Sequence, residues 1–444
     1  MMDMIALTRM RHSAVLLLAL IVLAGCVQPG RGPAAPTVPD APAIDPIVPG
    51  RVLSVLANLK VNQAGVGFEP SVKVGPDGTI YVTAAEGLHQ ERGVDGVQSS
   101  RLWVAHNGTG FAEVEPVDAA TGVSNLPYGM EGDLAVSPQG TAYFVDLTLA
   151  SVTVSRSNDA GRTWLVRNAA ALAVPWGDRE WVAAGEGDLV AVTWISQLNF
   201  VGAITQLWVA VSTDGGLTFA QQTPVVEAPP AGASGIAIAP DGTIVVGNNG
   251  DGVNAYVSRD AGQTFVAAKV LDTTNPTDYT FVSVAADAAN NLYATWAELK
   301  DGNAQVFYSA SSDHGATWMA PVRVSDPGGA AASPWIAAAA AGHAAVAFYA
   351  APGHPGDPNK VKGPWRPYLV DILDAASITP AITRLAMTDE PVSTKVICTT
   401  GYSSCGGTPP LGDFLQVAIG PDGSDHVVWA TDDQDVYWGL AGVR

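Results

Sequence analysis

Ser212-Thr213-Asp214-Gly215-Gly216-Leu217-Thr218-Phe219 is one of four copies of a pattern that reads Ser-x-Asp-x-Gly-x-Thr-aromatic. The other copies run over 157–164, 258–265 and 311–318. The Asp side chain can accept hydrogen bonds from backbone N–H groups that follow it, and the Gly can adopt a positive φ. Each copy therefore predicts a clamped turn with a structural aspartate, at Asp159, Asp214, Asp260 and Asp313.

The spacing of the clamps indicates the fold. The four aspartates lie 55, 46 and 53 residues apart. A second motif of the Pro-Asp-Gly type recurs in phase with them, at 75–79, 137–141, 239–243 and 420–424. Apolar runs flank each copy of this motif, which is typical of β-hairpins. Repeats of about 40 to 50 residues built from short strands are typical of propeller blades.

The repeats can be laid out as blades of about four strands each. Six units cover about 69–118, 130–172, 178–228, 233–272, 279–325 and 333–390. The last unit offers only three strands, near 414–419, 426–430 and 436–440, while the segment 52–60 belongs to no other unit. Closing the ring removes exposed sheet edges. We therefore expect an all-β, seven-bladed propeller closed by an N-terminal strand, with six blades as the alternative.

The N-terminal segment resembles a bacterial lipoprotein signal peptide over residues 1–25. Arg9 and Arg11 precede an apolar run that ends in Leu23-Ala24-Gly25-Cys26, which is similar to a lipobox. The resemblance implies cleavage before Cys26, lipidation of its thiol and attachment to the cell envelope, at the outer membrane or cell surface. A plain secretory signal and an uncleaved anchor are the alternatives.

Two further regions follow the signal. Residues 26–50 hold seven prolines, which favours an extended tether over a packed domain. A disordered leader without a spacing role is the alternative. Residues 51–444 form the expected propeller domain. Within it, Cys398 and Cys405 are separated by six residues, and we expect a disulfide between them in preference to a metal site.

The composition of the chain limits the classes of partner that it can be expected to bind. The formal net charge of −20 argues against a nucleic acid or an anionic membrane surface as a partner, so membrane contact is expected only through the lipid. The chain contains 47 Gly and 31 Pro, and only 14% of its residues are charged, which suits a turn-rich β protein. We expect a monomer that uses no cofactor.

The clamps and hairpin turns resemble the bacterial neuraminidase repeat, or Asp-box, family. This family includes sialidases, sortilin-type receptors, some glucanases and many exported proteins. The C-terminal segment, with Gly412-Asp413-Phe414, Pro421-Asp422-Gly423 and Asp435-Val436-Tyr437-Trp438, is also similar to that of sialidase-like propellers. The resemblance covers about 69–444 and implies the fold; because enzymes and non-enzymes share the repeat, it implies no single activity.

Topology places the expected site. If the first strand of each blade begins on the top face, the clamps lie on the bottom face, and the long variable loops lie on top. The starts of the first strands then meet at the channel mouth and bring together Glu69, Glu131, Asp133, Glu180 and Asp413. Crowded carboxylates raise one another's pKa or recruit a cation such as Ca²⁺, although solvated carboxylates are the simpler interpretation. Arg179 and Arg366 complete the weak catalytic candidates.

Ligand stacking and catalysis remain alternatives at this mouth. Trp181, Trp335 and Trp365 are candidates for stacking on a sugar, although tryptophans in propellers are more often packed. In sialidases the first substrate-binding arginine lies in a Phe-Arg-Ile-Pro motif, whereas this chain has Phe68-Glu69-Pro70-Ser71. A carboxylate there would repel a sialic acid, so we expect non-catalytic binding of a glycan or protein on the top face.

The alternative is a glycoside hydrolase, sialidase-like or of another carbohydrate-active kind, that uses a pair of mouth carboxylates. Geometry distinguishes the two functions. Two carboxylates that face each other across an open cleft would favour the enzyme. Carboxylates that accept hydrogen bonds from backbone N–H groups would favour the binding protein.

Overall fold

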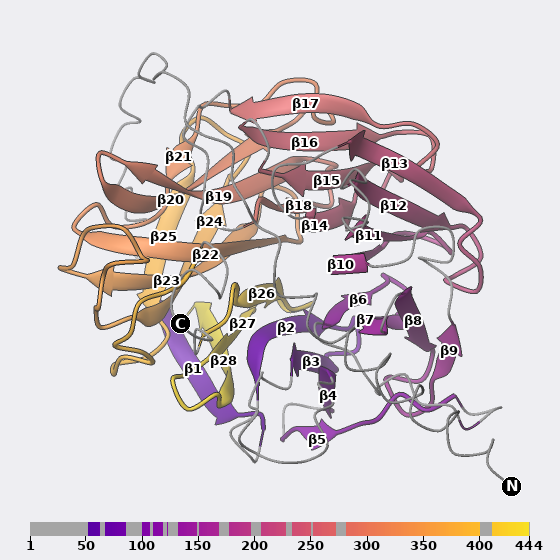
Figure 1. The fold of residues 1–444 in the computed structure, drawn as a ribbon, viewed down its shortest axis with the longest axis horizontal. Coiled ribbons are helices and arrows are strands. Elements are labelled where there is room, and N and C mark those ends of the chain that lie inside the picture. Colours follow the sequence, from indigo (N-terminus) through magenta and orange to yellow (C-terminus); the bar gives the residue numbers. More distant parts are fainter. Residues whose placement is uncertain are drawn as a thin grey trace, which may run out of the picture.

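The computed structural model describes residues 52–62, 67–85, 100–106, 110–118, 122, 132–148, 151–167, 177–196, 206–227, 233–249, 252–271, 281–399 and 411–443. Every element within these ranges is a strand, and the strands form seven four-stranded antiparallel sheets. Figure 1 shows the sheets arranged around a common centre. The predicted seven-bladed propeller is confirmed, and the six-bladed alternative is wrong.

Six blades take their strands from the centre outwards in chain order. The first three are β2 (Phe68–Val74), β3 (Ile80–Ala85), β4 (Ser100–Ala105) and β5 (Ala112–Glu113); β6 (Gly132–Val136), β7 (Ala142–Thr148), β8 (Ser151–Ser157) and β9 (Leu165–Arg167); and β10 (Gly177–Ala184), β11 (Val190–Ser196), β12 (Gln206–Ser212) and β13 (Gln221–Glu227). The next three are β14 (Ala233–Ile238), β15 (Ile244–Asn248), β16 (Val253–Ser258) and β17 (Val266–Leu271); β18 (Ser283–Ala286), β19 (Leu292–Lys300), β20 (Asn303–Ser311) and β21 (Val322–Arg323); and β22 (Gly329–Ala338), β23 (Ala344–Pro352), β24 (Arg366–Leu373) and β25 (Ala381–Ala386).

The seventh blade combines both ends of the described chain. It contains β26 (Gln416–Ile419), β27 (Asp425–Ala430) and β28 (Val436–Val443), and β1 (Leu53–Lys60) is its outermost strand. Leu53 lies opposite Val443, and Lys60 lies opposite Tyr437. In Figure 1 the indigo β1 runs beside the yellow β28. The N-terminal strand therefore closes the ring, as the unassigned segment 52–60 predicted.

Each of the four repeated motifs forms the same clamped turn. In the copy that follows β16, Asp260 accepts hydrogen bonds from the Thr264 hydroxyl at 2.6 Å and the Thr264 N–H at 2.9 Å. Hydrogen bonds lower the pKa of Asp260 to about 2. The largest effect comes from the Thr264 side chain, and smaller ones come from the Thr264 N–H and the Ser258 hydroxyl. Gly262 has a φ of 79°, which residues with a Cβ rarely adopt. These local hydrogen bonds to the aspartate stabilise the turn that connects the third strand of the blade to the fourth.

The clamps also join neighbouring blades. Arg156 Nη1 of the second blade donates a 2.8 Å hydrogen bond to the carbonyl of Gly215, in the clamp of the third. Arg259 of the fourth blade reaches the carbonyls of Asp313 and His314 in the fifth. Arginines at or beside one clamp therefore bind backbone carbonyls of the next clamp and join neighbouring blades.

Aromatic pairs recur between the second and third strands of four blades. Each pair occupies directly opposite positions in the register, and the two rings are close to parallel: Trp194 and Trp208, Trp296 and Phe307, Phe348 and Tyr368, and Trp429 and Tyr437. Cross-strand aromatic pairs stabilise a sheet beyond the area they bury. Among the described residues, no helix is long and apolar enough to cross a membrane.

Candidate functional site

Four first strands contain a register shift, or bulge. One lies between Ser234 and Ile236 in β14. The other three are wider and lie between Phe68 and Ser71 in β2, between Asp178 and Trp181 in β10, and between Ala332 and Trp335 in β22. Inside these bulges, Glu69, Arg179 and Ser333 have φ values of 53°, 60° and 58°. Positive φ is costly for residues with a Cβ, and bulges of this kind redirect side chains. The bulges therefore determine how the side chains at the channel mouth are presented.

Three of the predicted mouth residues form one linked group. The backbone N–H of Asp413 donates a 2.8 Å hydrogen bond to Glu69 Oε1, and Arg179 Nη1 lies 2.7 Å from Asp413 Oδ2. The Arg179 guanidinium also lies over the Phe281 ring, 4.9 Å from its centroid. Glu69 is only 2% exposed and Asp413 only 8%. This group joins the first, third and seventh blades.

Asp133 belongs to a separate buried network. Its Oδ1 accepts hydrogen bonds from the Ser71 hydroxyl at 2.6 Å and from the Gln416 amide at 3.2 Å, and its Oδ2 accepts one from the Val182 N–H at 3.1 Å. Lys73 Nζ donates to Gln416 Oε1 at 2.9 Å. Burial lowers the pKa of Lys73, and the charge of Asp133 partly opposes that effect. Four first strands thus meet in one polar network.

Two of the predicted stacking residues belong to an aromatic cluster formed by Trp181, Phe281, Trp335 and Phe414. The ring centroids of Trp181 lie 4.7 Å from those of Trp335 and 5.0 Å from those of Phe414. Trp181 is 2% exposed and Trp335 is 6% exposed. In this structure the two rings pack against protein, and their role in ligand stacking stays a prediction.

The remaining candidates occupy different places. Trp365 is fully buried, and its indole N–H donates to the Lys395 carbonyl at 2.8 Å. Glu180 is buried in β10. Arg366, on the third strand of the sixth blade, donates to the Asp389 carbonyl at 3.0 Å. Cys398 is buried, whereas Cys26, Glu131 and Cys405 lie outside the described residues, so lipidation and the disulfide stay predictions.

A pocket of about 470 Å³ opens on the same face, beside the seventh blade. Its walls come from the segment that follows β25 and from the loop between β27 and β28; the lining includes Asn58 of β1 and the aromatic pair Trp429 and Tyr437. Tyr437 is half-buried, and its ring lies 6.1 Å from that of Trp429 at an interplanar angle of 10°. The equivalent aromatic pairs pack within other blades, whereas this pair lines a cavity.

The pocket is acidic. Among the described residues, four carboxylates line it: Glu390, Asp432, Asp433 and Asp435. Lys60 Nζ lies 2.7 Å from Asp435 and Lys395 Nζ lies 3.9 Å from Asp432. This site was not predicted from the sequence, because its walls are far apart in the chain. The signal that was available is the acidic run Asp432-Asp433-Gln434-Asp435 between two aromatic strands.

No family model and no curated protein matches the chain. Solved structures with a similar fold include a protein of unknown function from Dyadobacter fermentans, which is 13% identical over 89% of this chain and 100% of its own, with a TM-score of 0.49. An intramolecular trans-sialidase from Ruminococcus gnavus is 12% identical over 86% and 94%, with a TM-score of 0.42. YCF48, solved bound to D1 peptide, is 10% identical over 87% and 94%, with a TM-score of 0.44. At these identities the likeness concerns the fold alone.

Proposed function

We propose that the protein is a non-catalytic propeller that is attached to the cell envelope by its N-terminal lipid and binds a glycan through the acidic pocket on its top face. The observation that carries the proposal is the state of the mouth carboxylates. Glu69 and Asp133 each accept a hydrogen bond from a backbone N–H, of Asp413 and Val182 respectively, and both are at least 97% buried. A catalytic acid, base or nucleophile must instead reach the substrate.

The pocket suits one or two sugar rings. Its volume falls in the range of small-ligand sites, and such sites combine aromatic surface with a few polar groups. Tyr437 supplies the aromatic surface, while Asn58 and Thr431 supply uncharged hydrogen-bonding groups. Ring-shaped ligands with hydroxyl or amine groups match this lining.

The charge of the pocket further limits the class of glycan that it would bind. Lys60 and Lys395 offset two of the four carboxylates, and Glu390 and Asp433 leave the pocket with a net negative charge, which repels sulfated, uronic and sialylated glycans and attracts cationic ones. A glycan that carries free amino groups therefore fits best. A protein segment rich in Lys or Arg has the same charge and is the competing ligand.

A glycan array that includes amino-sugar, neutral and sialylated glycans tests the proposal on the full-length protein. We expect binding to the amino-sugar set, at least tenfold weaker in Asp433→Asn and in Tyr437→Ala. Asp301→Asn is the matched control, because Asp301 is an exposed carboxylate in the top-face hairpin between β19 and β20. Its binding should equal that of the wild type.

Two results would overturn the proposal. Release of reducing ends or free sialic acid by the wild type, lost in Glu69→Gln or Glu131→Gln, would establish a glycoside hydrolase. Binding to basic peptides with no glycan signal would identify a protein receptor.

A further inference from the structure

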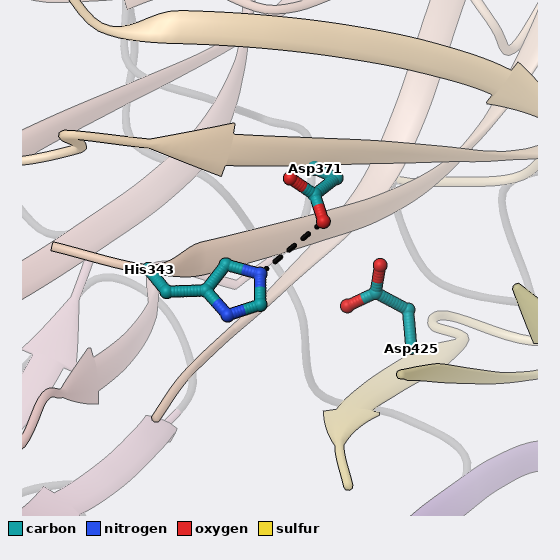
Figure 2. A group of neighbouring side chains, drawn as sticks. All are labelled: His343, Asp371 and Asp425. Atoms are coloured by element: carbon teal, nitrogen blue, oxygen red, sulfur yellow. Dashed lines mark hydrogen bonds and ion pairs between the residues drawn. The ribbon is translucent and has the colours of Figure 1, made fainter. Parts of the chain in front are cut away.

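We propose that His343, Asp371 and Asp425 form a binding site for one divalent transition-metal ion between the sixth and seventh blades. Figure 2 shows the imidazole and the two carboxylates converging from separate segments. His343 ends the turn before β23, Asp371 lies on β24, and Asp425 begins β27. The site lies on the bottom face, where the hairpin turns and clamps are, and it is independent of the proposed glycan pocket.

The three side chains are close enough to share an ion. One ligand atom from each lies within 4.8 Å of the others, and His343 Nε2 is 3.2 Å from Asp371 Oδ2. A tetrahedral ion with bonds of about 2.05 Å has ligand atoms about 3.3 Å apart. The His343 to Asp371 distance therefore matches one edge of such a site, and an oxygen of Asp425 lies within 4.8 Å of both ligand atoms.

Charge balance favours an ion there. Asp371 and Asp425 are each only 1% exposed, so two carboxylates share a site that is nearly closed to water. Placing two negative charges together in such a site is unfavourable unless cations compensate them. A divalent ion bound by the three side chains would carry the charge that offsets both carboxylates.

The donor set selects the metal. Ca²⁺ and Mg²⁺ prefer sites built of oxygen ligands, whereas one imidazole nitrogen with two carboxylate oxygens suits Zn²⁺ or Mn²⁺. The His343 side chain is 12% exposed, which leaves a route for an ion and for a water ligand in the fourth position. An ion bound here would join a strand of the sixth blade to the blade that closes the ring.

The test uses full-length protein stripped with a chelator and then titrated calorimetrically with Zn²⁺, Mn²⁺ and Ca²⁺. We expect one Zn²⁺ or Mn²⁺ per chain, a higher Tm with the ion than without it, and much weaker binding of Ca²⁺. Affinity for Zn²⁺ should fall at least tenfold in His343→Gln and in Asp425→Asn. Asp374→Asn, which changes an exposed carboxylate three residues from Asp371, should bind as the wild type does.

Anomalous scattering from crystals grown with Zn²⁺ gives a readout that does not depend on the folding of any variant. A peak among His343, Asp371 and Asp425 is expected. The proposal is overturned if wild-type protein binds no stoichiometric ion, if the peak lies elsewhere, or if all variants bind equally.

Discussion

Asp413 donates its backbone N–H to Glu69 Oε1 at 2.8 Å, a hydrogen bond that joins the last blade to the first across 344 positions of the sequence. Glu69 stands where sialidases are expected to place a substrate-binding arginine. In this chain Glu69 lies in a bulge at a positive φ, is buried, and accepts a hydrogen bond from the backbone of the seventh blade. The position therefore has the properties of an inter-blade link.

Glu69→Ala should lower the free energy of unfolding by about 1 to 3 kcal/mol, because it removes the acceptor of a buried N–H. Glu69→Gln keeps an acceptor oxygen and should lose less. Urea unfolding at pH 7 measures both. Equal stability of wild type and Glu69→Ala would show that the hydrogen bond contributes nothing.

Trp181→Ala should lower the free energy of unfolding by about 3 to 5 kcal/mol, since it opens a cavity in the aromatic cluster with Trp335 and Phe414. Trp181→Phe retains most of the contacts and should cost less. Denaturant unfolding gives the stability and the glycan array gives the binding. If Trp181→Ala leaves stability intact and abolishes glycan binding, its ring has the stacking role instead.

Gly262→Ala and Gly302→Ala separate backbone strain from steric overlap. Both glycines have φ near 80°, but a Cβ at Gly262 would overlap Val211 Cγ2, and one at Gly302 would meet nothing within 4 Å. Gly302→Ala should cost about 1 to 2 kcal/mol from φ alone. Gly262→Ala should cost about 1 to 3 kcal/mol more through overpacking. Similar Tm values for the two variants would refute this difference.

His426 should make the protein less stable in mild acid. Burial lowers the pKa of this imidazole to about 4, an effect that Asp422 partly opposes, whereas the pKa in the unfolded chain is about 6.5. The unfolded state therefore binds a proton first, so the stabilisation is complete above pH 6.5 and is lost as pH falls toward 4. Below that value the folded state is protonated as well, and the loss levels off.

The pH effect can be measured against a variant that does not titrate. Between pH 6.5 and 4.5, the titration of His426 should lower the free energy of unfolding of the wild type by about 2 kcal/mol. His426→Gln should lose that much less over the same interval, because glutamine binds no proton. Parallel stability curves for the two proteins would contradict the assignment to His426.

Local chemistry made most of the fold predictable. The clamp of Asp260 closes within five residues, so its sequence pattern contains the information that the turn requires. The closing strand was inferred because segment 52–60 remained after every other strand had a place. Conversely, Asp133 and Gln416 are 283 residues apart when they bond, and no local pattern specifies which residues of two inner strands will meet.

The two proposed sites were harder to predict for the same reason. The pocket combines β1, the segment after β25 and a hairpin of the last blade, and the metal cluster combines three segments of two blades. His343, Asp371 and Asp425 have no recognisable spacing in the sequence. Such sites depend on how blades pack together, which repeat motifs within single blades do not encode.

The shared seventh blade also determines when the ring can be completed. During synthesis Leu53 emerges early, yet its partner Val443 is among the last described residues to be made. Until then β1 has no strand to pair with, and the first and sixth blades leave uncovered the apolar faces that pack against the seventh blade. Folding of this protein therefore has a late, non-local step, and a nascent chain would need to be kept from aggregating until the final strand arrives.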